Sequence, residues 1–231
     1  MADLLDFGGA ALGNMLSADL RQRLSAAATP MRYGDGETIH SRGDAKPGLS
    51  MVRSGAVRFA IPGEDGSWVT TSILGPEHCF GEATLFAGLP RAYDAIAVGE
   101  TVVEQLTKRR FDAIFDEEPE LARALLAATT QRLYASLSFL DDQRRLPLKL
   151  RMAKIIVSMA RSAKRANVVE CNQSDFAFTL GVSRVSAGKA LGELQDVGFI
   201  RLGYGQIEIT GASSMHAWIL EHDPLAPLTE L

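Results

Sequence analysis

The chain has 231 residues, 46% of them hydrophobic, and a formal net charge of −4 at neutral pH. This length and composition allow one large domain or two small ones with buried cores, and they exclude a chain that is disordered throughout. The N-terminus has no basic start, and no stretch approaches the roughly 20 apolar residues that a membrane span needs. We therefore expect a cytoplasmic protein without a signal peptide or membrane contact.

The cysteine content argues against metal centres and disulfides. The two cysteines, Cys79 and Cys171, lie far apart without CxxC spacing, which does not suit a disulfide framework, a zinc knuckle or a four-cysteine cluster. No nucleophile, base and orienting group converge in the sequence, so we do not expect an enzyme. We expect no metal ligands and no covalent cofactor.

The charge is unevenly distributed along the chain. Residues 1–147 carry 15 Lys and Arg against 20 Asp and Glu, whereas residues 148–211 carry 9 against 5. The tail from residue 212 carries three acids and no Lys or Arg. The overall acidity therefore hides a basic module, and nucleic-acid binding has to be judged for each module separately.

The first third of the chain has the pattern of a small antiparallel barrel or roll. After a helical pattern that starts at Ser17, residues 31–100 hold 11 of the 21 glycines. Short alternating runs at 57–61 and 68–73 flank a hairpin connection at 62–66. Many short strands separated by glycine turns are typical of this architecture.

From about Asp112 to Arg145 the pattern becomes helical, with leucines at seven-residue spacing. The apolar stripe consists of Leu126, Leu133, Leu137 and Leu140, with Thr130 in the same seam. Such a stripe is suited to pairing with a second copy in a parallel homodimer, and the alternative is a helix packed on its own domain. Pro147 disfavours helical geometry at Leu146, which predicts a hinge and a new helix there.

The last 80 residues predict two helices joined by a tight turn, followed by two short strands. Asn172 and Asp175 fit the start of the first helix, and Ser183 fits the cap of the second. The segment 200–210 then alternates around Gly203-Tyr204-Gly205, as the wing of a winged helix does. An ordinary helical hairpin is the alternative.

Together these segments resemble the CRP/FNR family of bacterial transcription regulators from about Ser17 to Thr210. The most specific match is to the phosphate-binding cassette of the members that bind cyclic nucleotides, through Phe80-Gly81-Glu82, Leu85 and Pro90-Arg91-Ala92. The resemblance implies an α+β fold. It places a cyclic-nucleotide-binding β-roll (jelly roll) in residues 1–110, a long dimerisation helix and hinge in 111–146, and a winged helix-turn-helix with a C-terminal tail in 147–231.

The resemblance implies an effector site for a cyclic nucleotide, with cAMP favoured over cGMP because Ala92 stands where cGMP sites have threonine. The implied ligand residues are Gly81, Glu82, Ala83, Arg91, Ala92 and Ser136. Glycine lets the backbone approach the anion, arginine offers a forked donor to phosphate, and glutamate accepts a hydrogen bond from the ribose 2′-hydroxyl. Without a ligand, Glu82 and Arg91 are alternatively expected to pair with each other.

The resemblance also implies a palindromic DNA operator and contact with RNA polymerase. Arg184 matches the family arginine that binds guanine, Lys189 replaces a second arginine, and Val185 stands where cAMP-responsive members have glutamate. The expected DNA-binding residues are Gln173, Ser174, Ser183, Arg184, Val185, Ser186 and Lys189. The first two begin the first helix, where phosphate contacts are expected.

Several departures from the family pattern keep other effectors open. Ala83 replaces the usual leucine, and Tyr93 and Asp94 stand where small or apolar residues are usual. The alternatives are a regulator with another effector or none, and a cyclic-nucleotide-binding signalling subunit that does not bind DNA. An iron–sulfur sensor would need cysteines before Cys79, and a haem sensor at His78-Cys79 would need a histidine at the position of Gly81.

Overall fold

The computed structural model describes residues 11–62, 68–161, 167–171, 173–223 and 225. Contacts divide the described chain into two units, with the division after Leu133. Each unit has its own buried apolar core. The prediction of an α+β fold built on an antiparallel sheet is confirmed.

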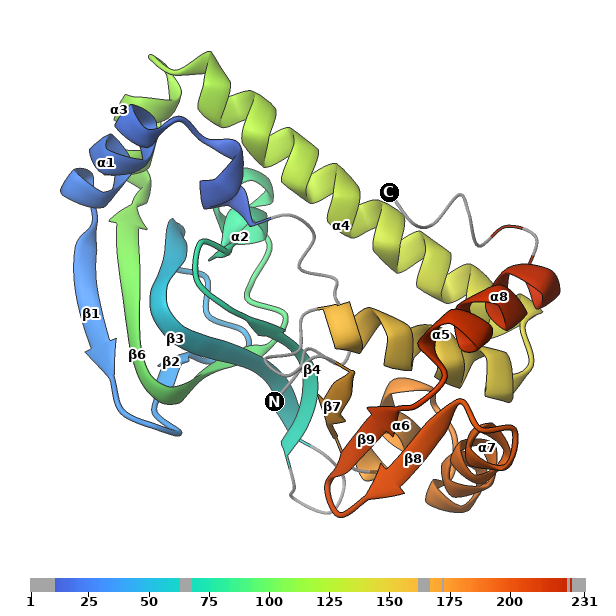
Figure 1. Cartoon of the computed structure of the whole chain (residues 1–231). Helices are drawn as coiled ribbons and strands as arrows, with labels where there is room; N and C mark the ends of the chain where they lie inside the picture. Colours follow the sequence, from blue (N-terminus) through green and yellow to red (C-terminus); the bar gives the residue numbers. More distant parts are fainter. Residues whose placement is uncertain (1–10, 63–67, 162–166, 172, 224, 226–231) are drawn as a thin grey trace. The chain divides into compact units, whose positions relative to one another are not determined.

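The N-terminal unit is an antiparallel roll flanked by short helices (Figure 1). Its elements are η1 (Leu12–Met15), α1 (Ala18–Ala27), β1 (Thr29–Tyr33), β2 (Thr38–His40), β3 (Gly48–Pro62), β4 (Trp68–Leu74), β5 (Cys79–Phe80), α2 (Glu82–Ala87), β6 (Asp94–Thr107), α3 (Lys108–Phe115) and the first part of α4 (Pro119–Arg145). The predicted helix start at Ser17 is confirmed, because the Ser17 side chain accepts a hydrogen bond from the Leu20 amide. The predicted hairpin between β3 and β4 is also confirmed, although residues 63–66 of its connection lie outside the described residues.

Two long strands, β3 and β6, form the centre of the roll. They pair antiparallel from Gly48–Thr107 to Ala60–Asp94, with register shifts around Ser54. Such irregularities bend a strand and increase its twist, which lets one sheet curl around a core. The strand order is β1-β6-β3-β4, and β2 and β5 pair with β6 and β3 respectively. As a result β5, whose Phe80 begins the predicted cassette, pairs with the start of β3 at Ser50 and Met51.

The predicted continuous helix from Asp112 to Arg145 is wrong at its start. The structure has two helices there, α3 and α4, separated by residues 116–118. Pro119 is the first residue of α4, where its missing N–H leaves no hydrogen bond unmade. A proline also disfavours helical geometry in the residue before it, here Glu118, so the helix has to restart.

The C-terminal unit contains the rest of α4 and a helical module with a three-stranded sheet. Its further elements are α5 (Leu148–Arg161), β7 (Val168–Glu170), α6 (Gln173–Thr179), α7 (Arg184–Asp196), β8 (Ile200–Gly203), β9 (Gln206–Ile209) and α8 (Ala212–His222). The sheet order is β7-β9-β8. The predicted wing corresponds to β8 and β9, whereas β7 and α8 were not predicted. The proposed cap residue Asn172 lies outside the described residues.

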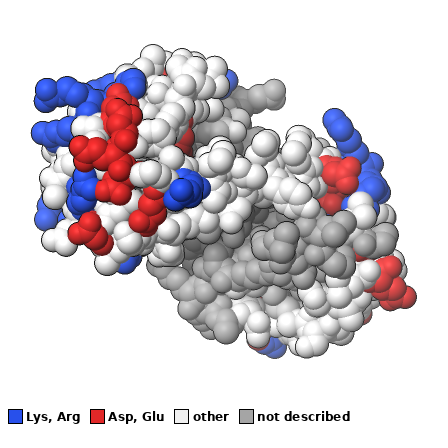
Figure 2. All heavy atoms as spheres, turned by 90° about the horizontal axis from the view of Figure 1, so that it is seen from above, with Lys and Arg blue, Asp and Glu red and all other residues white. Residues whose placement is uncertain are grey.

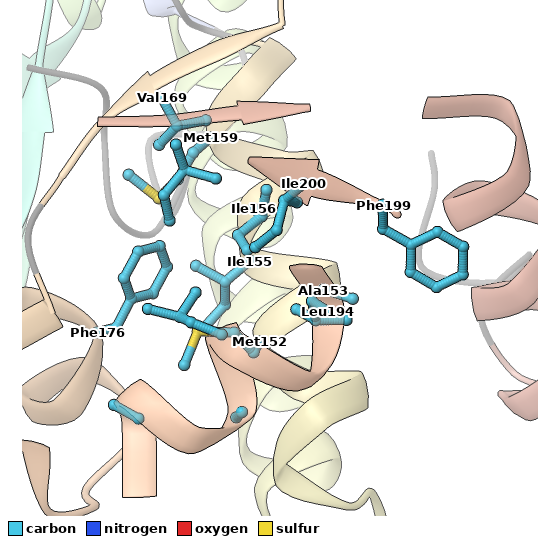
Figure 3. Close-up of a cluster of buried hydrophobic side chains, with 14 of the residues drawn as sticks. Met152, Ala153, Ile155, Ile156, Met159, Val169, Phe176, Leu194, Phe199 and Ile200 are labelled. Carbon is cyan, nitrogen blue, oxygen red and sulfur yellow. The ribbon is translucent and has the colours of Figure 1, made fainter. Parts of the chain in front are cut away.

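Helix α5 supplies one wall of the C-terminal core. Met152, Ile156 and Met159 lie on its buried face and meet Phe176 of α6 and Leu194 of α7, as Figure 3 shows. The spacing of three and four residues along α5 is that of one helix face. This core holds α6 and α7 in a fixed relation, and so positions the residues expected to contact DNA.

Charges are mixed on the face of the molecule that Figure 2 shows. Outside the grey atoms, Lys and Arg side chains lie among Asp and Glu, without a broad patch of one sign. The described residues also form ion pairs between partly exposed side chains, such as Arg23–Glu117 and Lys108–Asp112. Within the described ranges, no helix combines the length and the apolar character that a membrane span requires.

Candidate functional site

The predicted cassette is built around a left-handed glycine that starts helix α2. Gly81 has φ +109° and caps α2, and its carbonyl accepts a hydrogen bond from the Leu85 amide (3.0 Å). A Cβ at this position would lie 2.3 Å from the Gly48 carbonyl oxygen and 2.5 Å from Arg91 Nη1. Only glycine fits here, because a side chain would meet backbone and would also require a strained φ.

Arg91 lies against this glycine and is held there by its own backbone. Its amide donates to the Asp44 carbonyl, and its carbonyl accepts from the Gly43 amide, both at 2.8 Å. The guanidinium is half-buried, and its Nη2 donates to the Gly48 carbonyl at 3.4 Å. Among the described residues it forms no ion pair, and burial lowers its pKa despite the nearby carboxylates of Glu82 and Asp44. The Arg91 guanidinium therefore retains capacity to bind an anion.

Glu82 pairs with Arg132 and not with Arg91, so the alternative of a Glu82–Arg91 pair is wrong. Arg132 Nη1 donates to Glu82 Oε1 at 2.6 Å, and its Nη2 donates to the Cys79 carbonyl at 3.0 Å. Both side chains are largely buried. Arg132 comes from α4, 50 residues away in sequence, so no local spacing marked it as a partner of the cassette.

Cys79 completes this cluster as a thiol. Its Sγ donates to Glu82 Oε1 at 3.1 Å, and burial, reinforced by the Glu82 charge, raises the pKa of the thiol. The neighbouring His78 ring uses Nδ1 for contacts of 3.1 and 3.2 Å to the Gly75 and Pro76 carbonyls. The two residues that suggested a haem site thus have structural contacts within the loop and the strand.

Aromatic rings line the roll beside the cassette. The ring of Phe59 packs edge-on against the rings of Phe80 and Tyr93, with centroid distances of 5.4 Å and 6.4 Å. The centroid of the His40 ring lies 5.6 Å from that of Phe80. Burial, together with the charge of Arg91, lowers the pKa of His40 to about 4. Asp94, which the sequence suggested as a competitor for Arg91, instead accepts a hydrogen bond from the Arg42 amide at 3.1 Å.

The remaining predicted ligand residues are found at separate places. Ala83 is exposed on α2, and its carbonyl accepts from the Leu89 amide at 3.2 Å. Ala92 is exposed directly after Arg91. Ser136 is half-buried on α4, in the C-terminal unit, so its part in the effector site stays a prediction.

The predicted recognition helix begins at Arg184, as expected. Ser183 caps α7 by accepting a hydrogen bond from the Ser186 amide at 3.1 Å. Arg184, Val185 and Lys189 project into solvent, and Val185 is 83% exposed. A valine so exposed at a helix start has no role in the core of this unit.

Helix α6 packs beside α7, and its N-terminus lies close to that helix. Gln173 Oε1 is 3.4 Å from the position of a Cβ on Gly188, so a side chain at residue 188 would press on Gln173. Gln173 is exposed and Ser174 is half-buried at the start of α6. The structure therefore brings the residues expected to contact phosphates beside the helix expected to read bases.

The predicted seam of α4 is exposed along the helix. The exposed fractions are 70% for Leu126, 58% for Leu133, 55% for Leu137 and 51% for Leu140. In its first three turns α4 uses another face for the core of its unit, where Leu121, Leu125 and Ala128 are buried. The alternative, in which the stripe packs on its own unit, is not supported by these exposures.

A family model connects the roll with nucleotide binding. The model of the cyclic nucleotide-binding domain matches residues 30–118, which span β1 to α3 and include the whole cassette.

Curated relatives and solved structures match most of the chain. The transcriptional regulator SdrP of Thermus thermophilus is 31% identical over 166 residues, covering 68% of this chain and 77% of the relative. The cyclic AMP receptor protein of the same organism is 28% identical over 181 residues, covering 78% and 83%. A solved transcriptional regulator of the CRP/FNR family, also from Thermus thermophilus, has a TM-score of 0.69 and 25% identity, covering 84% of this chain and all of that one.

Proposed function

The chain belongs to the CRP/FNR family of transcription regulators, and we propose that it is a homodimeric DNA-binding regulator controlled by a cyclic nucleotide, cAMP in the first place. The observation that carries the effector proposal is the half-buried Arg91, which forms no ion pair among the described residues and lies against the left-handed Gly81. A half-buried cation beside a glycine and the start of a helix matches the needs of a cyclic phosphate, which has one charge and two exocyclic oxygens.

The carboxylate of Glu82 suits the sugar of the nucleotide. Its Oε1 accepts from Arg132 and from the Cys79 thiol, which fixes the carboxylate beside Gly81. The partly neutralised carboxylate still has acceptor positions for a ribose hydroxyl. The exposed Ala92 after Arg91 and the cyclic AMP receptor protein among the relatives favour cAMP. Tyr93, exposed next to Ala92, is the feature that favours a regulator of the same type with a different effector.

DNA binding is proposed for α6, α7 and the strands that follow. A capped helix with Arg184, Val185 and Lys189 in solvent fits the major groove, where arginine bonds bidentately to guanine and valine contacts a thymine methyl. Gln173 and Ser174 suit phosphate contacts. We expect a palindromic operator with half-sites about 34–36 Å apart. RNA polymerase is the further partner expected of a family member.

We propose that effector binding and DNA binding are coupled through α4. On this proposal the effector roll comprises residues 1–110, the dimerisation helix and the turn after it comprise 111–146, and the DNA-binding module comprises 147–231. The exposed leucines of α4 would pair two copies. A nucleotide shifts the arrangement of the pair only if it binds one arrangement more tightly than the other.

Two binding measurements test the proposal. Calorimetric titration of the purified chain with cAMP and with cGMP should give saturable binding of one site per chain, tighter for cAMP. Fluorescence anisotropy with DNA selected from a random pool should show tighter binding when cAMP is present. Arg184→Ala should cost about 1–3 kcal/mol and remove the preference at one guanine of each half-site only. A selected motif without twofold symmetry, or one indifferent to Arg184→Ala, would contradict the DNA-binding proposal.

A further inference from the structure

Four charged side chains meet at the turn between α4 and α5. Asp223 follows α8, and its side chain is fully buried. Its two carboxylate oxygens accept from Arg145 Nη2 at 3.0 Å and from Lys154 Nζ at 2.7 Å. Lys154 Nζ also lies 2.6 Å from Asp142 Oδ2. These ion pairs tie the last turn of α4 to α5 and to the segment after α8.

Further contacts hold the same turn. Leu146 is buried in the C-terminal core, Phe139 of α4 packs against that core, and a hydrogen bond joins Arg151 to Gln143. The turn itself is short, since the Leu146 amide still donates to Asp142 and the Leu150 amide donates to Pro147, both at 3.0 Å. Figure 1 shows α8 alongside α5 near this end of α4. The turn is thus packed and cross-linked within one unit.

Asp223 is the carboxylate that joins Arg145 and Lys154 from outside α4. It receives one cation from α4 and one from α5. Removing its charge leaves Lys154 with Asp142 and leaves Arg145 with Asp141 and Asp142 of its own helix, so the ionic link to the segment after α8 is lost. Removing one partner of a buried ion pair costs stability, and the largely buried Lys154 would keep one carboxylate, Asp142, where it had two. We expect the structure to respond by local opening of the turn between α4 and α5.

We propose that Asp223 is a positioning residue that locks the α4–α5 turn, so that the last turns of α4 and the DNA-binding module move as one body. The joint through which an effector acts would then lie within α4, near the division of the chain after Leu133, and not at Pro147. The position of the joint rests on the proposed control by an effector. The lock itself is a property of the C-terminal unit alone.

The lock is tested by amide hydrogen exchange on the full chain without ligand. Asp223→Asn should speed exchange in residues 142–151 by about tenfold or more, while residues 190–196 in the core helix α7 keep their protection. The control Glu221→Gln removes an exposed carboxylate from the last turn of α8, two residues before Asp223, and should change neither segment. If Asp223→Asn also speeds exchange in residues 190–196, the test uses the variant Arg145→Gln instead. In that variant Lys154 still compensates the charge of Asp223. Unchanged exchange in residues 142–151 in the variant that keeps its core overturns the lock.

The position of the joint is tested by adding cAMP to the wild type. The change in exchange should fall within residues 128–138 and leave residues 142–151 unaltered. An accelerated exchange of residues 142–151 on adding cAMP, comparable to that of Asp223→Asn, would make the turn the joint and overturn the proposal. A protein that does not bind cAMP at all refutes the proposed effector, and the Asp223 variants then decide the lock by themselves.

Discussion

Two arginines, Arg132 and Arg91, lie near the carboxylate of Glu82, and they make different contacts. Arg132 neutralises Glu82 directly, with a 2.6 Å contact, whereas Arg91 lies against Gly81 and forms no ion pair among the described residues. An arginine engaged with a carboxylate is a poor ligand for a phosphate, because the carboxylate competes for the same donors. On the proposed function, Arg91 is therefore the residue left for the anion, and the Glu82–Arg132 pair would hold the acceptor for the sugar.

Replacing Arg91 should weaken cAMP binding more than replacing Glu82. Arg91→Leu removes hydrogen bonds to a charged group, worth about 1.5–3 kcal/mol, whereas Glu82→Gln weakens a bond to a neutral hydroxyl, worth about 1 kcal/mol. Calorimetry should give a loss of about tenfold or more for Arg91→Leu and a smaller loss for Glu82→Gln. Arg42→Leu, which removes an exposed arginine of the adjacent loop, is the control and should bind normally. Equal affinities for wild type and Arg91→Leu would remove Arg91 from the site.

His40 should report on the charge of Arg91. Its pKa of about 4 in the folded protein lies below the ordinary value near 6.5, so His40 stabilises the fold fully above pH 6.5. That contribution is lost as the pH falls from 6.5 towards 4, because the unfolded chain takes up the proton first. NMR titration of the imidazole should show a midpoint near 4, and bound cAMP should raise it by neutralising Arg91. An imidazole that titrates near 6.5 would contradict the burial of His40.

At the scale of elements, helix α2 depends on the residue before it. Gly81→Ala places a Cβ 2.3 Å from the Gly48 carbonyl and forces an L-residue to φ +109°. A strained backbone of this kind costs about 1–3 kcal/mol before the clash is added. Urea unfolding followed by the fluorescence of Trp68, in a Trp218→Phe background, should show at least this loss. Gly75→Ala, where a Cβ meets nothing within 4 Å, should be nearly neutral, and equal stabilities of the two variants would contradict the close approach.

The elements that sequence patterns predicted are those with local signals. Ser183 marks its helix start by a side-chain cap, and the alternation in β3 and β4 marks a hairpin. Pro119 carried an equally local signal, yet the apolar periodicity on both sides of it suggested one helix. β7 has three residues, too few to show a period, and α8 buries only Met215 and Ile219, so its apolar face gives a weak pattern.

The sequence predicted the site residues that are close together in the chain, and it did not predict the partners that come from distant parts of the chain. Gly81, Glu82 and Arg91 belong to one stretch of sequence, so a motif could mark them. Arg132 and the lock at Asp223 join residues 50 and more apart, through contacts that only the folded chain creates. No spacing in a single sequence carries that information.

At the scale of the whole molecule, the exposed stripe on α4 needs a partner. Four leucines with exposed fractions of 51–70% lie on one helix at spacings of seven and four or three residues. Monomeric proteins seldom leave such a contiguous apolar stripe in water, and a second copy of the same helix would cover it with matching side chains. A twofold-symmetric pair would also present two copies of α7, as a palindromic operator requires.

Placing a charge in this stripe should therefore separate the dimer. Leu133→Asp, and independently Leu140→Asp, would bury a carboxylate between the helices at a cost of roughly several kcal/mol per ion. Sedimentation at micromolar concentration should show wild-type dimers and variant monomers. The variants should also lose specific DNA binding, because each monomer holds only one half-site, while Trp68 fluorescence stays that of a folded roll. Ala127→Asp, about 100° around the helix from Leu126, is the matched control and should remain dimeric. A wild-type protein that sediments as a monomer, or a Leu133→Asp variant that remains a dimer, would show that the stripe serves another purpose.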